Sequence, residues 1–270
     1  YADQQLQEHP DGDFAIGLKI FPDLTGPPPP LSLDRDISLA DSLTVDAVSM
    51  VIDPEGATLA ALDSIAGTVD DKRADSTLII IALGYSADAA QQFRKSPADY
   101  TTKRVADIDR IARALRPDIL IPALDPYDDG SRAIGAQPPE YWTDYITRAA
   151  AVAHHVNQRI RIGVSASSYG ARDSTLYFWA AKRGSPVDVV GFTMLPGFDG
   201  ATSLDTHMRI AQRWMRAFAV KPKPHWVFAA GGYPVAHGEE SQELALWGVL
   251  AWATSQAAIK GLVVADAGDY

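Results

Sequence analysis

The sequence contains no cysteine, and this absence limits the chemistry that the chain can perform. Without a thiol, the chain forms no disulfide bond, no thiolate metal site and no cysteine nucleophile. A protein without cysteine is compatible with an oxidising or a reducing compartment. The redox environment therefore stays open at this point.

The sequence also lacks a long apolar run and an excess of basic residues. No stretch approaches the roughly 18 uninterrupted apolar residues that a membrane-spanning helix requires. Lysine and arginine number 24 against 34 aspartates and glutamates, which gives a formal net charge of −10. This balance disfavours nucleic acid and anionic membrane surfaces as partners, and it favours neutral ligands.

The chain begins at Tyr1 without a methionine, and no segment resembles a signal peptide. We therefore expect a processed or truncated precursor that acts outside the cytoplasm, whose missing flanking residues allow membrane attachment. The first 13 residues are polar and contain the turn-forming run His9-Pro10-Asp11-Gly12. We predict an extended arm over residues 1–13 and a single domain over residues 14–270, because 47% hydrophobic residues suffice for one sizeable core.

Eight short apolar runs punctuate the rest of the sequence. Each run is rich in valine, isoleucine or leucine and is continuous rather than alternating, which is typical of strands buried on both faces. The predicted strands are Phe14–Phe21, Ala47–Ile52, Thr77–Leu83, Ile119–Leu124, Ile160–Ser165, Val187–Met194, His225–Ala230 and Gly261–Ala265.

Longer segments with helical periodicity separate these runs. In Thr101–Arg116, Val105, Ile108 and Ile111 recur at helical spacing, and Ser96-Pro97 has the pattern of an N-cap followed by proline. Further helices are predicted over Thr58–Val69, from Pro138-Pro139-Glu140 through Val156, and over Asp173–Arg183, Ser203–Phe218 and Glu239–Gln256, with a short first connection over Ser32–Leu43.

Strand and helix alternating eight times without a break in composition predict a closed (β/α)8 TIM barrel. A doubly wound open sheet is the main alternative. That fold usually has a glycine-rich phosphate loop after its first strand, and Gly17–Phe21 does not have that pattern. Because the last strand ends close to Tyr270, we expect the barrel to lack its final helix in this chain.

Active sites of such barrels lie at the carboxyl ends of the strands. Polar and aromatic residues follow most of the predicted strands, and this mixture suits a hydroxylated ligand. The predicted ligand-binding residues are Asp53, Tyr85, Tyr127, Tyr169, Thr193, Tyr233 and Asp266, with Lys19, Asp125 and Ser165 also at strand ends.

Several of these strands resemble those of retaining glycoside hydrolases built on a (β/α)8 barrel. Trp226–Pro234 is similar to the seventh strand of that family, which carries a glutamate followed by glycine and an aromatic residue. Ser185–Pro196 is similar to the sixth strand and Lys260–Val264 to the eighth. Asp118–Pro126 lies where the family has a fourth strand that ends in Asn-Glu-Pro. The resemblance implies a glycoside-hydrolase-like fold and a carbohydrate ligand.

The departures from the family pattern fall on its catalytic positions. Retaining hydrolysis needs two carboxyl groups about 5–5.5 Å apart, one as nucleophile and one as acid/base. The nucleophile position is matched by Ala230, or by Ala229 if the register slips by one residue, and the acid/base position by Asp125. The neighbouring asparagine is matched by Leu124 and the tyrosine of the sixth strand by Leu195. The pattern indicates a pseudoenzyme.

Three hypotheses follow. The first is a non-catalytic barrel that binds a glycan or a protein, alone or as one part of a larger assembly, with Asp125 bracing the loop to Gly130. The second is an active glycosidase in which Asp125 works with a carboxylate from Asp53, Asp266 or Asp269. The third is a barrel enzyme with Lys19 as a Schiff-base amine. We expect no cofactor and no metal, because no histidine pair has metal-ligand spacing.

Overall fold

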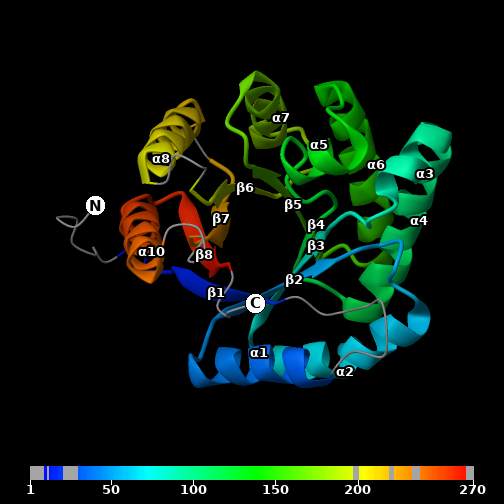
Figure 1. Cartoon of the computed structure of the whole chain (residues 1–270), viewed down its shortest axis with the longest axis horizontal. Helices are drawn as coiled ribbons and strands as arrows, with labels where there is room; N and C mark the ends of the chain where they lie inside the picture. Colours follow the sequence, from blue (N-terminus) through cyan, green and yellow to red (C-terminus); the bar gives the residue numbers. More distant parts are fainter. Residues whose placement is uncertain are drawn as a thin grey trace.

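Eight parallel strands form a closed barrel in chain order, surrounded by helices (Figure 1). The computed structural model describes residues 9–10, 12–20, 30–196, 201–218, 222–232 and 238–265. The strands are β1 (Ala15–Ile20), β2 (Ala47–Ile52), β3 (Leu78–Leu83), β4 (Ile119–Ile121), β5 (Arg161–Ala166), β6 (Val189–Met194), β7 (His225–Ala230) and β8 (Ile259–Val264). The TIM-barrel prediction is confirmed, and the predicted bounds of β2 and β7 coincide with the observed ones.

The predicted helices are present, and two short helices at the mouth of the barrel were missed. The larger helices are α1 (Pro30–Ser42), α2 (Leu59–Ala74), α4 (Pro97–Leu115), α6 (Pro139–Val156), α7 (Ala171–Ala181), α8 (Ala201–Arg216) and α10 (Glu239–Thr254). The missed helices, α3 (Ala89–Lys95) and α5 (Asp129–Ile134), are too short to show apolar periodicity. Within the described part of the chain no helix follows β8, as predicted.

Two apolar layers explain why the strand sequences are continuous rather than alternating. The larger layer lies between the barrel and the helices and includes Phe192 and Leu262. The smaller layer fills the barrel interior and includes Ile80, Trp226 and Phe228. Because every strand except β5 contributes apolar residues to both layers, most strand residues are buried.

The aromatic residues of β7 fill the interior at the expense of side chains on neighbouring strands. A Cβ atom built on Gly191 would lie 2.2 Å from the Phe228 ring, and one on Gly261 would lie 2.6 Å from the Trp226 ring. Glycine at these positions therefore makes room for the two large rings. With its interior filled, the barrel is a packed core and not a pore.

Aspartates brace the amino-terminal end of the barrel before three alternate strands, β2, β4 and β6. Asp46, Asp118 and Asp188 immediately precede β2, β4 and β6. Each carboxylate accepts a hydrogen bond from a backbone N–H of the preceding strand. The bonds run from Ile16 to Asp46 (2.9 Å), from Ile79 to Asp118 (2.8 Å) and from Ile162 to Asp188 (2.8 Å). These aspartates stabilise the end of the barrel opposite to the mouth.

The described end of the predicted N-terminal arm packs onto this same end of the barrel. His9 is buried, and its Nε2 atom lies 3.3 Å from the carbonyl oxygen of Gln256. Asp13 forms an ion pair with Lys260 of β8. The boundary between arm and barrel at residue 13 stays a prediction.

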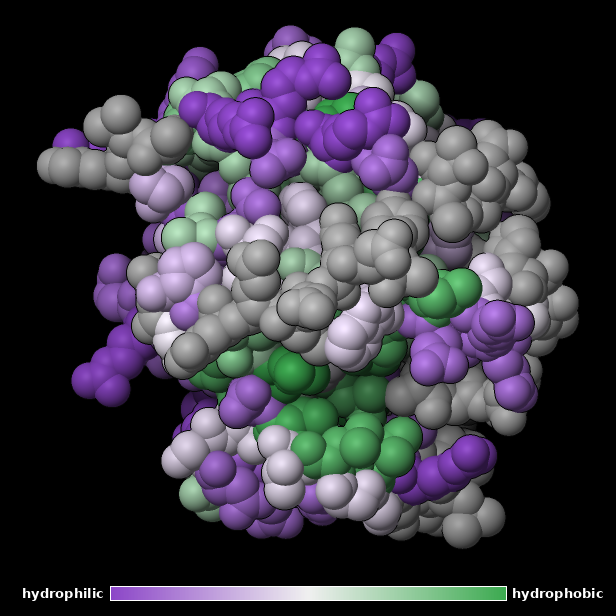
Figure 2. Space-filling model, turned by 90° about the vertical axis from the view of Figure 1, so that its left-hand side faces the viewer, coloured by the Kyte–Doolittle hydropathy of each residue, from purple (hydrophilic) through white to green (hydrophobic). Residues whose placement is uncertain are grey.

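One flank of the barrel exposes apolar side chains. Ile16 of β1 and Leu43 after α1 are 40% and 56% exposed, and Leu244 and Trp247 of α10 are 44% and 41% exposed. Figure 2 faces the side that carries α10 and β1, and apolar side chains gather in its lower half, toward α1. No described helix is long and apolar enough to cross a membrane.

Candidate functional site

Asp125 lies at the carboxyl end of β4 and points into the barrel mouth. The residue adopts a left-handed backbone conformation with φ of 38°, and its carbonyl oxygen accepts hydrogen bonds from the N–H groups of Asp128 and Gly130. The backbone of Asp125 thus braces the loop to Gly130, which is the role that the first hypothesis gave it. Its side chain, however, leaves the loop and reaches across two neighbouring strands.

Ser165 of β5 and Thr193 of β6 hold the Asp125 carboxylate from two sides. The Ser165 hydroxyl donates to Oδ1 of Asp125 at 2.7 Å, and the Thr193 hydroxyl lies 2.8 Å from Oδ1 and 3.0 Å from Oδ2. Asp125 is 6% exposed, Ser165 is fully buried and Thr193 is 7% exposed. We call these three residues the central cluster. Because Asp125 follows β4, and Ser165 and Thr193 lie near the ends of β5 and β6, the cluster links three successive strands at the mouth.

Burial raises the pKa of Asp125 to about 6, and the nearby Asp129 carboxylate adds to the rise. The hydrogen bonds from Ser165 and Thr193 and the charge of Lys19 act in the opposite direction. Asp125 therefore changes its charge near neutral pH. This property suits a general acid or base, although structural networks also shift pKa values.

Lys19 of β1 faces the same mouth. It pairs with Ser49 of β2, and the pairing two residues earlier joins Gly17 to Ala47, which belongs to the interior layer. Partners on adjacent parallel strands point to the same face, so Lys19 also points inward. An amine and a carboxyl group therefore share the mouth of the barrel.

A register shift decides which alanine of β7 faces Asp125. Between Phe192 and Thr193 the pairing of β6 with β7 shifts, so that Thr193 pairs with Ala229 and Met194 with Ala230. Thr193 points inward to the central cluster, whereas Met194 belongs to the outer layer. Ala229 therefore occupies the mouth, and Ala230, the first choice from the sequence, faces the helices.

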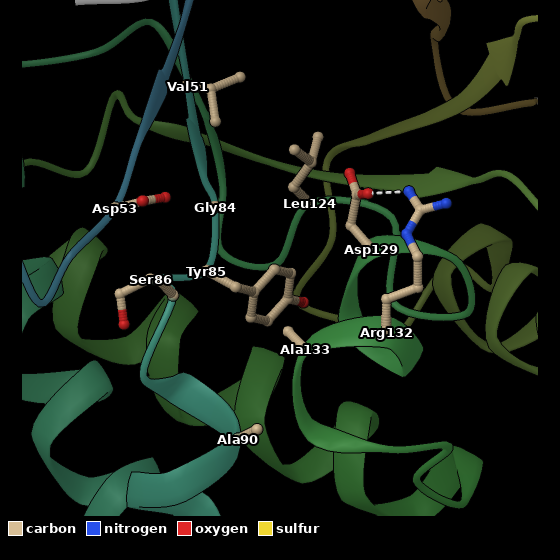
Figure 3. A pocket seen from close by; sticks show the side chains of 11 residues that line it. Val51, Asp53, Gly84, Tyr85, Ser86, Ala90, Leu124, Asp129, Arg132 and Ala133 are labelled. Carbon is tan, nitrogen blue, oxygen red and sulfur yellow. Dashed lines mark hydrogen bonds and ion pairs between the residues drawn. The ribbon is translucent and has the colours of Figure 1, made fainter. Parts of the chain in front are cut away.

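A cavity of about 420 Å³ opens beside the central cluster, at the carboxyl ends of β2, β3 and β4 (Figure 3). We call it the side pocket. Its walls come from the strand ends and from α3 and α5. The lining residues are Val51, Asp53, Gly84, Tyr85, Ser86, Ala87, Ala90, Leu124, Asp129, Arg132 and Ala133. The pocket thus contains two residues predicted from strand ends, Asp53 and Tyr85.

Asp53 lines the side pocket without a hydrogen-bond donor. It is half-buried, and no described residue donates to its carboxylate. Burial raises the pKa of Asp53, Glu55 raises it further, and Arg104 lowers it. A Cβ atom on Gly84 would lie 2.5 Å from Oδ1 of Asp53, so glycine at this position allows the carboxylate its place.

Tyr85 lies over a buried arginine. The guanidinium carbon of Arg104 lies 4.6 Å from the centre of the Tyr85 ring, and Arg104 also donates to the carbonyl oxygen of Gly84 at 2.8 Å. Arg104 forms a buried ion pair with Glu55 at 3.4 Å. The Tyr85 hydroxyl is buried and has no hydrogen-bond partner among the described residues, and burial raises its pKa well above the ordinary value.

Two other predicted residues, Tyr127 and Tyr169, do not line the side pocket. Tyr127 is half-buried, and burial first and the Asp173 charge second raise its pKa. Tyr169 is buried in the outer layer, where its hydroxyl donates to the carbonyl oxygen of Thr193 at 2.9 Å and its ring stacks on His207 at 4.2 Å. This packing leaves Tyr169 no face for a ligand. Tyr233 and Asp266, as well as Asp269, lie outside the described residues.

Sequence reasoning missed the α5 side of the pocket. Arg132 contacts Asp129 and lies 3.0 Å from Asp128. The spacing of three and four residues between these charges is a helical signal that could have identified α5. In the described ranges, no group of three or more histidine, aspartate or glutamate side chains is arranged to hold a metal ion.

Comparison with protein-family models and with curated proteins finds no match to this chain. Solved structures do match. The family 1 β-glucosidase of Thermotoga maritima is 13% identical, with a TM-score of 0.69 over 96% of this chain and 89% of that one. Thermotoga maritima Cel5A, solved with mannotriose, is 12% identical, with a TM-score of 0.67 over 94% and 89%. Xylanase 10B of Thermotoga petrophila is 11% identical, with a TM-score of 0.59 over 93% and 82%. At these identities the likeness shows a shared fold, and it confirms the glycoside-hydrolase-like barrel.

Proposed function

We propose that this protein is a glycoside-hydrolase-like barrel that binds a carbohydrate at its mouth and does not hydrolyse it by the retaining mechanism. The observation that carries the proposal is the methyl group of Ala229 on β7, on the face that the central cluster shares. A methyl group cannot attack an anomeric carbon or stabilise an oxocarbenium ion.

The surroundings of Asp125 support the same proposal. A retaining acid/base must be free to give its proton to the leaving oxygen. Here both carboxylate oxygens lie within hydrogen-bond distance of the Thr193 hydroxyl, one of them also contacts Ser165, and the residue is 6% exposed. Asp125 is thus engaged with its own strands.

The side pocket supports carbohydrate binding. Cavities of about 300–1,000 Å³ with an apolar lining and a few polar groups are typical small-molecule sites. This pocket has about 420 Å³, apolar residues such as Val51 and Leu124, and the carboxylates of Asp53 and Asp129. The net charge of −10 favours a neutral or positively charged ligand over nucleic acid. The proposal includes an extracytoplasmic location. A protein ligand is the alternative to the carbohydrate.

A second candidate, an active glycosidase, is favoured by one observation. The pKa of about 6 for Asp125 is that of a carboxyl group able to donate a proton near neutral pH. Such an enzyme would need a second carboxylate, from Asp53, Asp266 or Asp269. The two candidates differ in whether the protein cleaves a glycosidic bond, and a retaining enzyme would in addition form a glycosyl ester with the second carboxylate.

Covalent trapping separates them. We would incubate the chain with 2-deoxy-2-fluoroglycosyl fluorides, which accumulate a glycosyl-enzyme ester in retaining enzymes, and measure the intact mass. We expect no added mass, no release of nitrophenol from aryl glycosides, and retention on a glycan array. An added glycosyl mass mapped to Asp53, Asp266 or Asp269 would overturn the proposal. Failure to bind any glycan would overturn its binding part.

A further inference from the structure

We infer that the side pocket selects a sugar that carries a protonated amine, with the ammonium group at Asp53. The inference rests on the proposed carbohydrate binding and adds a ligand class to it.

Among the described residues, no cationic side chain forms an ion pair with Asp53. On the α5 wall, one guanidinium, that of Arg132, contacts both Asp128 and Asp129. Arg104, which lies against the Tyr85 ring and does not line the pocket, forms its ion pair with Glu55. Figure 3 shows Asp53 and Ser86 on one side of the pocket and Asp129 with Arg132 on the other. The described charges at the pocket are therefore negative on balance.

The Asp53 carboxylate is also short of donors. The Ser86 hydroxyl donates to Asp88 at 2.6 Å, and no described residue donates to Asp53. An ammonium group offers three donors and a positive charge, and charge-assisted hydrogen bonds are about twice as strong as neutral ones. A hydroxyl group offers one donor and no charge. The carboxylate thus favours an amine over a hydroxyl at the same ring position.

The rest of the pocket suits a sugar ring rather than a bare amine. Val51, Leu124 and Ala133 supply apolar surface for the C–H groups of a pyranose. An independent feature is the Tyr85 hydroxyl, which is buried at the pocket and has no partner in the described part of the chain. A buried hydroxyl without a partner costs free energy, so a ligand hydroxyl that reaches it gains a hydrogen bond that the protein leaves unmade.

Calorimetric titration of the full chain tests the inference with three sugars of one shape. At pH 7 and low salt we expect glucosamine to bind at least about tenfold more tightly than glucose or N-acetylglucosamine, whose nitrogen is uncharged. The preference should disappear in Asp53→Asn. Asp63→Asn is the matched control, because Asp63 is exposed on α2 and its loss changes the net charge equally.

The remaining outcomes separate this inference from the proposed function. Equal affinity for glucose and glucosamine would overturn the amine preference and leave carbohydrate binding intact. Absence of binding to every glycan would overturn both. Cyclohexylamine binding as tightly as glucosamine would overturn the role of the sugar ring. Tyr85→Phe should lower the affinity for glucosamine about threefold without lowering thermal stability. An unchanged affinity would show that the Tyr85 hydroxyl does not contact the sugar.

Discussion

Two carboxylates at the same end of the barrel have opposite surroundings. Asp125 in the central cluster is buried and receives hydrogen bonds from hydroxyls on two other strands. Asp53 in the side pocket is half-buried and receives none from the described residues. Burial is the largest cause of the raised pKa in both. A raised pKa therefore does not separate a structural carboxyl group from one open to a ligand, whereas the supply of donors does.

The difference has a simple origin in the backbone. Asp53 directly continues the line of β2, beside a glycine that leaves room for its carboxylate. Asp125 follows the end of β4 by several residues with a left-handed φ, and its side chain reaches Ser165 and Thr193 on the neighbouring strands. The Asp53 carboxylate therefore faces the side pocket, whereas the Asp125 carboxylate is buried in the barrel mouth.

The largest effect should come from removing the central carboxyl group. Asp125→Ala, measured at pH 5 where the group is mostly protonated, should lower the free energy of unfolding by about 2–4 kcal/mol. The reasons are a new cavity and the loss of hydrogen bonds to Ser165 and Thr193. Urea unfolding followed by circular dichroism measures it. Asp53→Ala is the matched control and should cost less than about 1 kcal/mol; equal costs would abolish the contrast.

The second effect is a pH dependence that belongs to Asp125. Its folded pKa of about 6 lies above the model-peptide value of 3.8. The stability contributed by this group is thus fully present below the unfolded pKa and is lost as the pH rises through the folded pKa. Between pH 4 and pH 7 the loss should reach about 2 kcal/mol. Unfolding free energies of the wild type and of Asp125→Asn across this range should diverge by that amount, and parallel curves would contradict the burial argument.

A third, smaller effect tests the geometry of the side pocket. Gly84→Ala places a methyl group 2.5 Å from Oδ1 of Asp53 and should displace the carboxylate. We expect glucosamine affinity to fall about fivefold. The control is Gly67→Ala on α2, where the added Cβ meets no atom within 4 Å. That substitution should leave affinity unchanged and raise stability by up to about 1 kcal/mol. Equal affinity in both variants would show that Asp53 does not contact the amine.

The smallest effect concerns the charge balance of the pocket. Arg132→Ala removes a side chain that is 69% exposed and should change stability by less than about 0.5 kcal/mol. Because it leaves Asp128 and Asp129 uncompensated, glucosamine should bind about twofold to threefold more tightly at low salt, and the gain should vanish at high salt. Arg209→Ala on α8, which breaks a similar exposed pair with Asp205, is the control. Weaker binding in Arg132→Ala would assign Arg132 a direct contact with the ligand.

Much of the barrel was predictable because a strand that is buried on both faces has a continuous run of apolar residues in the sequence. The bounds of β2 and β7 were predicted to the residue, and Asp53, Tyr85 and Thr193 lie at the barrel mouth, as their places at strand ends indicate; their role in ligand binding stays a prediction. Tyr169 also follows a strand, yet it turns outward and stacks on His207. Position after a strand therefore selects candidates, but the direction of each loop side chain depends on packing that the local sequence does not record.

The eight apolar runs, the order of strand and helix, and the lack of an acid on β7 depend on residue type and local periodicity, so they can be read from the sequence. The choice of Ala229 over Ala230 at the mouth depends on a register shift between two strands and follows from the folded barrel alone. The same holds for the contacts of Ser165 and Thr193 with Asp125, and for the place of Asp53, to which no described residue donates. Hydrogen bonds between residues 28 to 68 positions apart exist only once the barrel has closed.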